Sequence, residues 1–181
     1  MQSTLNPKNT LFVCIDLQEK LLPLMAHKDE LVKNANLLLN SAQILGVLTL
    51  ISEQYPKGLG KTHELIHTPK GAKVLEKTSF GLFNDERIKE FITQSGCKTL
   101  VIFGIESHIC VLQSVIDGLS LGYECIIAGD GVSSRSATHH KFALDFFAQN
   151  GASVLPSESI VFRLLGDSKH EKFKEISALV K

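Results

Sequence analysis

The stretch 99-TLVIFGIESHICVLQSVIDGLSLGYECIIA-128 contains the pattern that decides the fold. It begins with an apolar run over 99–103, typical of a buried parallel strand, and ends with a second such run over 124–128. Between them, residues 107–121 have the apolar spacing of a helix that stops at Gly122. A strand, a helix and a strand in this order predict two parallel strands joined by a helical crossover.

The same alternation continues on both sides of this unit. The other predicted strands cover 10–15, 47–51, 73–76 and 152–155. The other predicted helices cover 29–45, 84–94 with Asn84 as the cap, 138–149 and the C-terminal tail. Residues 54–71 are rich in Gly, Pro and polar residues, which predicts a long loop. This alternation predicts one α/β domain over 1–181, a Rossmann-like three-layer αβα sandwich with a mostly parallel six-stranded sheet.

The charges of the chain cancel, since 19 lysines and arginines match 19 aspartates and glutamates. Without a basic stripe or an acidic tail, the chain is not expected to bind nucleic acid or an anionic membrane. Neutrality favours association between copies of the chain. No apolar run approaches the roughly 18 residues that a membrane-spanning helix needs.

Cysteine usage indicates a reducing compartment. The four cysteines are Cys14, Cys97, Cys110 and Cys125, and they form no C-x-x-C pair and no zinc-ligand spacing. Free thiols suit the cytoplasm. The N-terminal stretch MQSTLNPKNT is polar and has no apolar signal region. We therefore expect a cytoplasmic protein.

Three residues with reactive side chains, Asp16, Lys77 and Cys110, fall just beyond predicted strands. Ligands of parallel sheets bind at the carboxyl edge, where the strand order reverses. Taken singly, each has an ordinary explanation, as a turn aspartate, a solvated lysine and a buried small hydrophobe. Together they predict a reactive cysteine. A helix start and a nearby lysine both lower a thiol pKa, and Asp16 can accept the thiol proton.

At this point five motifs resemble those of the isochorismatase-like cysteine hydrolases. They are IDLQ (15–18), SEQYPKGLG (52–60), KTSF (77–80), GIESHICV (104–111) and GDGVSSRS (129–136). The resemblance extends from about residue 10 to 165. It is strongest to the branch of uncharacterised hydrolases with an isochorismatase domain.

The resemblance implies roles for particular residues. The Asp, Lys and Cys of the family's catalytic triad fall on Asp16, Lys77 and Cys110. The family also has a cis peptide bond, which falls on Ile105–Glu106. The N–H groups of Glu106 and Cys110 are then expected to form the oxyanion hole.

The implied activity is hydrolysis of the C–N bond of a small amide through a thioester on the cysteine. The residues expected to bind the substrate are Gln18, Phe80, Ile105 and His108. The family is usually oligomeric, so the resemblance also implies a homodimer or a larger assembly. No cofactor is expected.

A metal site is not expected either. Nicotinamidases of this family bind zinc through an Asp-x-His pair, and here Glu53 and Tyr55 occupy the corresponding positions. His63 and His67 are spaced like two ligands on one helical face, but no acidic x-His partner precedes them. His139 and His140 receive no role from the sequence.

Two other functions stay open. One is an isochorismate-type vinyl-ether hydrolase, a chemistry that needs no cysteine nucleophile. The other is a non-catalytic binding or assembly protein that retains the site residues. The physiological substrate does not follow from the sequence, because pocket specificity depends on loop geometry.

Overall fold

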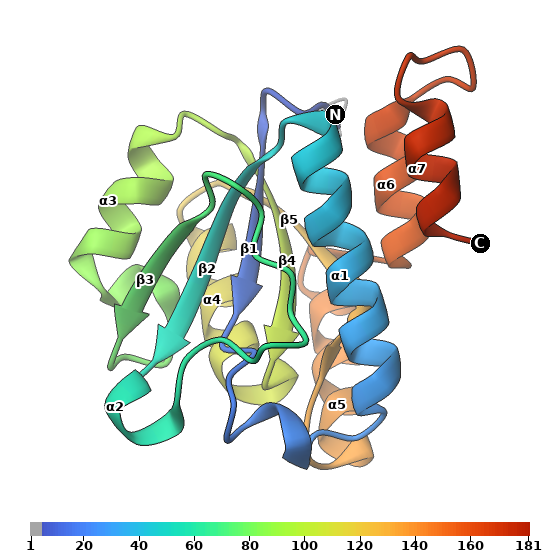
Figure 1. The fold of residues 1–181 in the computed structure, drawn as a ribbon. Helices are drawn as coiled ribbons and strands as arrows, with labels where there is room; N and C mark the ends of the chain where they lie inside the picture. Colours follow the sequence, from blue (N-terminus) through green and yellow to red (C-terminus); the bar gives the residue numbers. More distant parts are fainter. Residues whose placement is uncertain (1–4) are drawn as a thin grey trace.

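The computed structural model describes residues 5–181, so residues 1–4 of the polar N-terminal stretch lie outside the described part. Its centre is a six-stranded sheet in which all neighbouring strands are parallel. The strands are β1 (Thr10–Ile15), β2 (Leu48–Gln54), β3 (Lys73–Lys77), β4 (Thr99–Ile105), β5 (Glu124–Ser133) and β6 (Ser153–Leu155). They lie in the order β3-β2-β1-β4-β5-β6 (Figure 1). The predicted six-stranded parallel sheet is confirmed.

Helices cover both faces of this sheet. They are α1 (Lys28–Leu45), α2 (Pro56–Leu59), α3 (Glu86–Gln94), α4 (Leu112–Ser120), α5 (Ala137–Gln149), α6 (Ser157–Leu165) and α7 (Phe173–Leu179). Figure 1 shows α1, α6 and α7 side by side on one face, whereas α3, α4 and α5 lie on the other. Right-handed crossovers produce this arrangement, because the chain leaves β1 toward one edge of the sheet and leaves β4 toward the other. The three-layer αβα prediction is confirmed.

The central strands match the sequence prediction because they are buried on both sides. Every residue of β1 and β4 is buried, so both strands read as continuous apolar runs. Phe12 and Phe103 meet edge to face between them, with ring centroids 6.1 Å apart. No helix within residues 5–181 is both long and apolar enough to cross a bilayer.

Strand β5 is longer than the predicted 124–128. It continues through three polar or small residues to Ser133, and its register with β4 shifts between Ile102 and Gly104. The polar interruption is tolerated because the Asp130 carboxylate accepts hydrogen bonds from the N–H and hydroxyl of Ser157, at 2.8 and 2.6 Å. Apolar periodicity alone ends this strand too early.

Two other local predictions are corrected. The cap of α3 is Asp85, not Asn84, because the Asp85 side chain accepts from the N–H groups of Arg87 and Ile88. Asn84 instead ends a short 3₁₀ turn. The predicted loop 54–71 contains the short helix α2.

The strand order reverses between β1 and β4, which places a binding edge at their carboxyl ends. Gly104 allows these ends to approach. Its φ is +114°, and a Cβ there would lie 2.1 Å from the carbonyl oxygen of Ile15. Only glycine fits at this position. The residues that follow β1 and β4 therefore begin close together.

Candidate active site

Asp16 and Lys77 form a buried ion pair at this edge of the sheet. The Lys77 Nζ lies 2.7 Å from Asp16 Oδ2, and the two side chains are 0% and 1% exposed. Asp16 has a φ of +55°, in the left-handed region that aspartate tolerates better than most residues. Neither residue is a solvated surface group. Buried charges persist only when they are paired and hydrogen-bonded.

Two residues that the sequence analysis did not single out complete the hydrogen bonds of this pair. The hydroxyl of Ser52 donates to Asp16 Oδ1 at 2.6 Å. Lys77 Nζ donates to Gln54 Oε1 at 2.7 Å and to the carbonyl of Ser79 at 3.3 Å. Ser52 and Gln54 end β2, which lies between β1 and β3. Their position beyond the predicted end of this strand was the available signal.

Cys110 follows β4 in a wide turn of π-helical form, Ser107–Val111. The N–H of Val111 donates to the carbonyl of Glu106, five residues earlier, at 3.2 Å. The α-helix α4 begins only at Leu112. Cys110 thus lies in the first turn of the helical segment, as expected, but this turn is π-helical and not α-helical. Such π-type turns frequently occur at functional sites.

The predicted lowering of the Cys110 thiol pKa is wrong. Burial and, after it, the Asp16 carboxylate raise the pKa of this thiol to about 12, although Lys77 acts to lower it. The sequence brought the cation and the carboxylate together, but it did not reveal the burial of the thiol, with Cys110 7% exposed, nor that the carboxylate affects the thiol pKa more than the cation does. The thiol is thus protonated at neutral pH, and a carboxylate lies beside it.

The peptide bond between Ile105 and Glu106 is cis, as the resemblance implied. Glu106 is held by the segment after β5, because its carboxylate accepts from the backbone N–H and from Nε of Arg135, at 3.0 and 3.1 Å. These bonds fasten the turn that carries Cys110. The oxyanion-hole role of the Glu106 and Cys110 N–H groups stays a prediction.

The residues expected to bind the substrate lie in different surroundings. Gln18 has no exposed surface, and its amide donates to the carbonyls of Gln54 and Gly60, at 2.9 and 2.6 Å. It therefore ties the segment after β1 to the end of β2 and to the residue after α2. Ile105 is fully buried, whereas Phe80 is largely exposed. Their contact with a substrate stays a prediction.

His108 lies in an apolar groove between α4 and α5 of about 330 Å³. The groove is lined by His108, Leu112, His139, Phe142, Ala143 and Phe146. Burial, and secondarily the neighbours His139 and Arg135, lower the pKa of His108, against a raising effect of Glu106. His108 is thus mainly neutral at pH 7.

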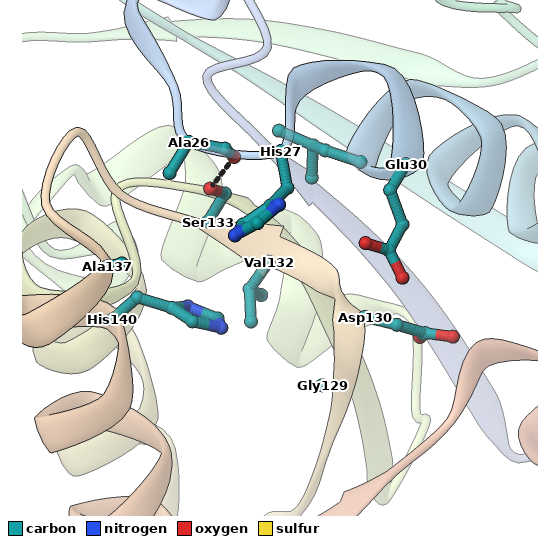
Figure 2. A pocket seen from close by; sticks show the side chains of 10 residues that line it. Ala26, His27, Glu30, Gly129, Asp130, Val132, Ser133, Ala137 and His140 are labelled. Atoms are coloured by element: carbon teal, nitrogen blue, oxygen red, sulfur yellow. Dashed lines mark hydrogen bonds between the residues drawn. The ribbon is translucent and has the colours of Figure 1, made fainter.

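The other histidines that the sequence left without a role are dispersed. His63 accepts from the N–H of Leu65, and His67 contacts the side chain of Gln43. His139 lies against the ring of His108, and His140 lines a separate cavity (Figure 2). Within residues 5–181, no group of three or more His, Cys, Asp or Glu side chains is placed to hold a metal ion. Metal independence stays a prediction.

The arrangement can support acyl transfer. A thiol, a carboxylate able to accept its proton and a compensating ammonium lie together in a water-poor site. Such a group can activate a nucleophile at the moment of attack, without a resting thiolate.

Comparison with known proteins gives a consistent result. The family model described as the isochorismatase domain matches residues 10–159. The isochorismatase domain-containing protein 1 of Salmo salar is 38% identical over 175 residues, covering 97% of this chain and 62% of that protein. The chain thus spans less than two thirds of that relative's length.

Two further relatives match over most of their length. The isochorismatase domain-containing protein 2 of Xenopus laevis is 36% identical over 172 residues, covering 95% of this chain and 83% of that protein. A solved structure, described as MAR1 ribonuclease from Caenorhabditis elegans, is 33% identical with a TM-score of 0.93. It covers 98% of this chain and 92% of its own.

Proposed function

The chain belongs to the isochorismatase family, and from this premise we propose that it is a cysteine-dependent hydrolase of small amides. The observation that supports the proposal most is the placement of the Cys110 thiol against the buried Asp16–Lys77 pair. Three chain segments that are distant in sequence supply a nucleophile, a base and a counter-charge at one edge of the sheet.

In the proposed reaction, Cys110 attacks the amide carbonyl while Asp16 accepts the thiol proton. The N–H groups of Glu106 and Cys110 stabilise the oxyanion, a contribution of about 3–4 kcal/mol per donor in comparable sites. Asp16 then gives the proton to the leaving amine, and the carbon–nitrogen bond breaks. Asp16 next takes a proton from water, which attacks the thioester. The carbon–sulfur bond breaks, the acid is released, and Asp16 returns its proton to the Cys110 thiolate. No metal or cofactor enters these steps.

Lys77 has an electrostatic role in this proposal. Its ammonium is held by Asp16, Gln54 and Ser79 and has no exposed surface, so it is not placed to exchange protons with bulk water. It offsets the negative charge that develops as the thiol gives up its proton. This accounts for a cation beside a thiol that is neutral at rest.

A small substrate fits the site better than a polymer. The three catalytic side chains are almost fully buried, and the chain has no net charge. A ribonuclease, as the relative from C. elegans is described, binds a polyanion and would gain from exposed cations around the nucleophile. We also propose a cytoplasmic location, because all four cysteines are free thiols.

The two rival functions are less favoured by the same contacts. A vinyl-ether hydrolase of the isochorismate type needs no thiol beside its carboxylate. Burying an ion pair costs desolvation free energy. A binding protein gains little in return, whereas an enzyme can use the buried charges in its reaction.

Alkylation of Cys110 tests the assigned roles. We expect Asp16→Asn to speed the reaction of Cys110 with iodoacetamide, because loss of the carboxylate removes a cause of the raised thiol pKa. The same variant should lose amide turnover, since an amide side chain accepts no proton. Lys77→Met should slow alkylation, because the effect that lowers the pKa is gone. Rates are measured by peptide mapping from neutral to alkaline pH.

Cys125 is the internal control for this experiment. Its thiol is also buried, with a pKa raised to about 12, but neither Asp16 nor Lys77 contributes to that shift. Its alkylation rate in each protein reports any general loss of stability, and the Cys110 rate is compared with it. A change of Cys110 in the same direction in both variants would contradict the assigned roles.

We further propose that the chain forms a homodimer or a larger assembly through the α4–α5 groove. Phe142 is 63% exposed there, beside the partly exposed Phe146. Such a patch on a neutral chain favours a second copy. Lys141 and Asp145, 2.6 Å apart along α5, make the surface self-complementary. In an antiparallel pair of α5 helices, each Lys141 faces Asp145 of the second copy.

Charge reversal tests this interface. Light scattering of the wild type should give at least twice the chain mass of 19.9 kDa. Lys141→Asp should weaken the assembly, because two aspartates then face each other. Adding Asp145→Lys should restore it. Phe142→Glu should give monomers. Leu65→Glu, a change at an exposed apolar residue outside the groove, should not. A monomeric wild type, or an assembly that survives Phe142→Glu, would overturn the proposal.

A further inference from the structure

Two fully buried serines connect two histidines through an unbroken chain of hydrogen bonds. The hydroxyls of Ser107 and Ser134 lie 2.5 Å apart. Ser107 Oγ also lies 3.2 Å from Nδ1 of His140, and Ser134 Oγ lies 2.8 Å from Nδ1 of His108. The hydrogen bonds therefore connect the residues in the order His108, Ser134, Ser107, His140.

This chain crosses the candidate catalytic turn. Ser107 directly follows the cis peptide bond and begins the turn that contains Cys110. Ser134 follows β5 and precedes Arg135, which holds Glu106. The turn is thus fastened to the segment after β5 both by the Glu106–Arg135 pair and by the two serines.

The two ends of this hydrogen-bond chain, His108 and His140, reach different cavities. His108 lies in the groove between α4 and α5. His140 points into a cavity of about 310 Å³, between the start of α1 and the end of β5 (Figure 2). Other polar side chains that line this second cavity are His27, Glu30 and Asp130. The chain therefore joins two solvent-accessible spaces through a buried centre.

The number of available protons restricts which tautomers His108 and His140 can adopt. Three contacts need three donated protons, and each serine hydroxyl supplies one. The third must come from Nδ1 of one histidine. If neither Nδ1 carries a proton, two acceptors face each other at one contact. If both do, one buried hydroxyl is left without an acceptor, which costs about 1–3 kcal/mol. All groups are satisfied only when the histidines are opposite tautomers.

The surroundings of the two rings decide which histidine donates. Around His140, the carboxylates of Glu30 and Asp130 line the cavity and favour a proton on its outer nitrogen, Nε2. Burial and the ring of His27 lower the pKa of His140, so the ring is neutral and carries one proton. Its Nδ1 then accepts from Ser107. Following the chain, His108 must carry its proton on Nδ1. The charged groups near His108 are Glu106 and Arg135, which pair with each other, and His139 lies beside its ring.

We propose that Ser107 and Ser134 are positioning residues that lock the catalytic turn and force His108 into the Nδ1–H tautomer and His140 into the Nε2–H tautomer. A consequence is that the outer nitrogen of His108 is an acceptor where it faces the groove. Whether the tautomer of His108 matters for catalysis depends on the proposed function. The hydrogen-bond chain is a property of the resting protein and does not depend on it.

Nuclear magnetic resonance of the histidine nitrogens tests the proposal on the whole chain. In the wild type at neutral pH, we expect Nδ1–H at His108 and Nε2–H at His140, each assigned by single replacement of that histidine with glutamine. In Ser107→Ala, His108 should switch to Nε2–H, although Ser107 does not contact it. The reason is that Ser134 can then place its proton only on His108. Ser107→Thr keeps the hydroxyl and should keep the wild-type pattern.

The outcomes are decisive in both directions. The same tautomer at both histidines in the wild type overturns the proposal, and this needs no variant to fold. An unchanged His108 in a folded Ser107→Ala also overturns it, because a merely structural serine would not alter a ring that it does not touch. Cys110 alkylation in the same samples reports on the proposed function separately. A failed hydrolase assignment would leave the tautomer pattern intact.

Discussion

Replacing Cys110 with alanine is expected to abolish turnover of every amide that the wild-type chain hydrolyses. When nucleophile, base and counter-charge act as a unit, loss of the nucleophile costs a factor on the order of 10⁶ in kcat. The fold should persist, because Cys110 is a small side chain and its truncation costs about 1 kcal/mol. The measurement combines a screen of small amides with mass spectrometry, which should detect a thioester on the Cys110 peptide of the wild type alone.

Cys125→Ala is the matched control for this experiment. Cys125 is as buried as Cys110, and burial raises its thiol pKa to about 12 as well. It lies against Gly118 of α4, away from Asp16 and Lys77. Its replacement should leave turnover and thioester formation unchanged. Full turnover by Cys110→Ala, on an amide, isochorismate or RNA, would exclude the covalent mechanism.

The second large effect concerns stability. Asp16→Asn and Lys77→Met should each lower the free energy of unfolding by about 3–5 kcal/mol, since either change leaves the other member of a buried pair without its partner. Asparagine is chosen because it tolerates the left-handed backbone of Asp16. The double variant has no unpaired charge, so it should lose clearly less than the sum of the single losses. Urea unfolding at constant protein concentration measures all four proteins.

An exposed ion pair provides the comparison for this cycle. Lys172 and Glu175 lie 3.1 Å apart, and their side chains are 37% and 54% exposed. Neutralising either one should change the free energy of unfolding much less than a change in the buried pair, because exposed ion pairs contribute little to stability. Additive losses at Asp16 and Lys77 would mean that the two residues do not act as a pair in solution.

Features that depend on neighbours along the chain were predictable from the sequence. Strand β1 was predicted with its observed bounds, because burial on both faces requires a continuous apolar run. The bounds of α1 were predicted within one residue, since Gly46 ends the helix in a left-handed conformation. The rule that sites lie at the carboxyl edge of a parallel sheet brought Asp16, Lys77 and Cys110 into consideration together.

The chemistry of the site was less predictable, because it depends on distant segments. Asp16 bonds to Ser52 and Lys77, 36 and 61 positions away. Neither the two β2 residues that support the ion pair nor the bonds of Gln18 to the end of β2 and to the residue after α2 have a signal in local periodicity. The wide turn at Cys110 is equally hidden, because it covers only five residues, too few for a periodicity to show.

The amino-acid sequence by itself therefore determined the layers, the succession of strands and helices along the polypeptide, and the edge of the sheet at which the reactive residues lie. Only the tertiary structure decided the protonation of the thiol. The sequence reveals which charges are present, but the pKa of Cys110 depends on how deeply the thiol is buried and on which of Asp16 and Lys77 acts more strongly on it. The hydrogen-bond chain from His108 to His140 likewise exists only because folding joins the end of β4, the end of β5 and α5.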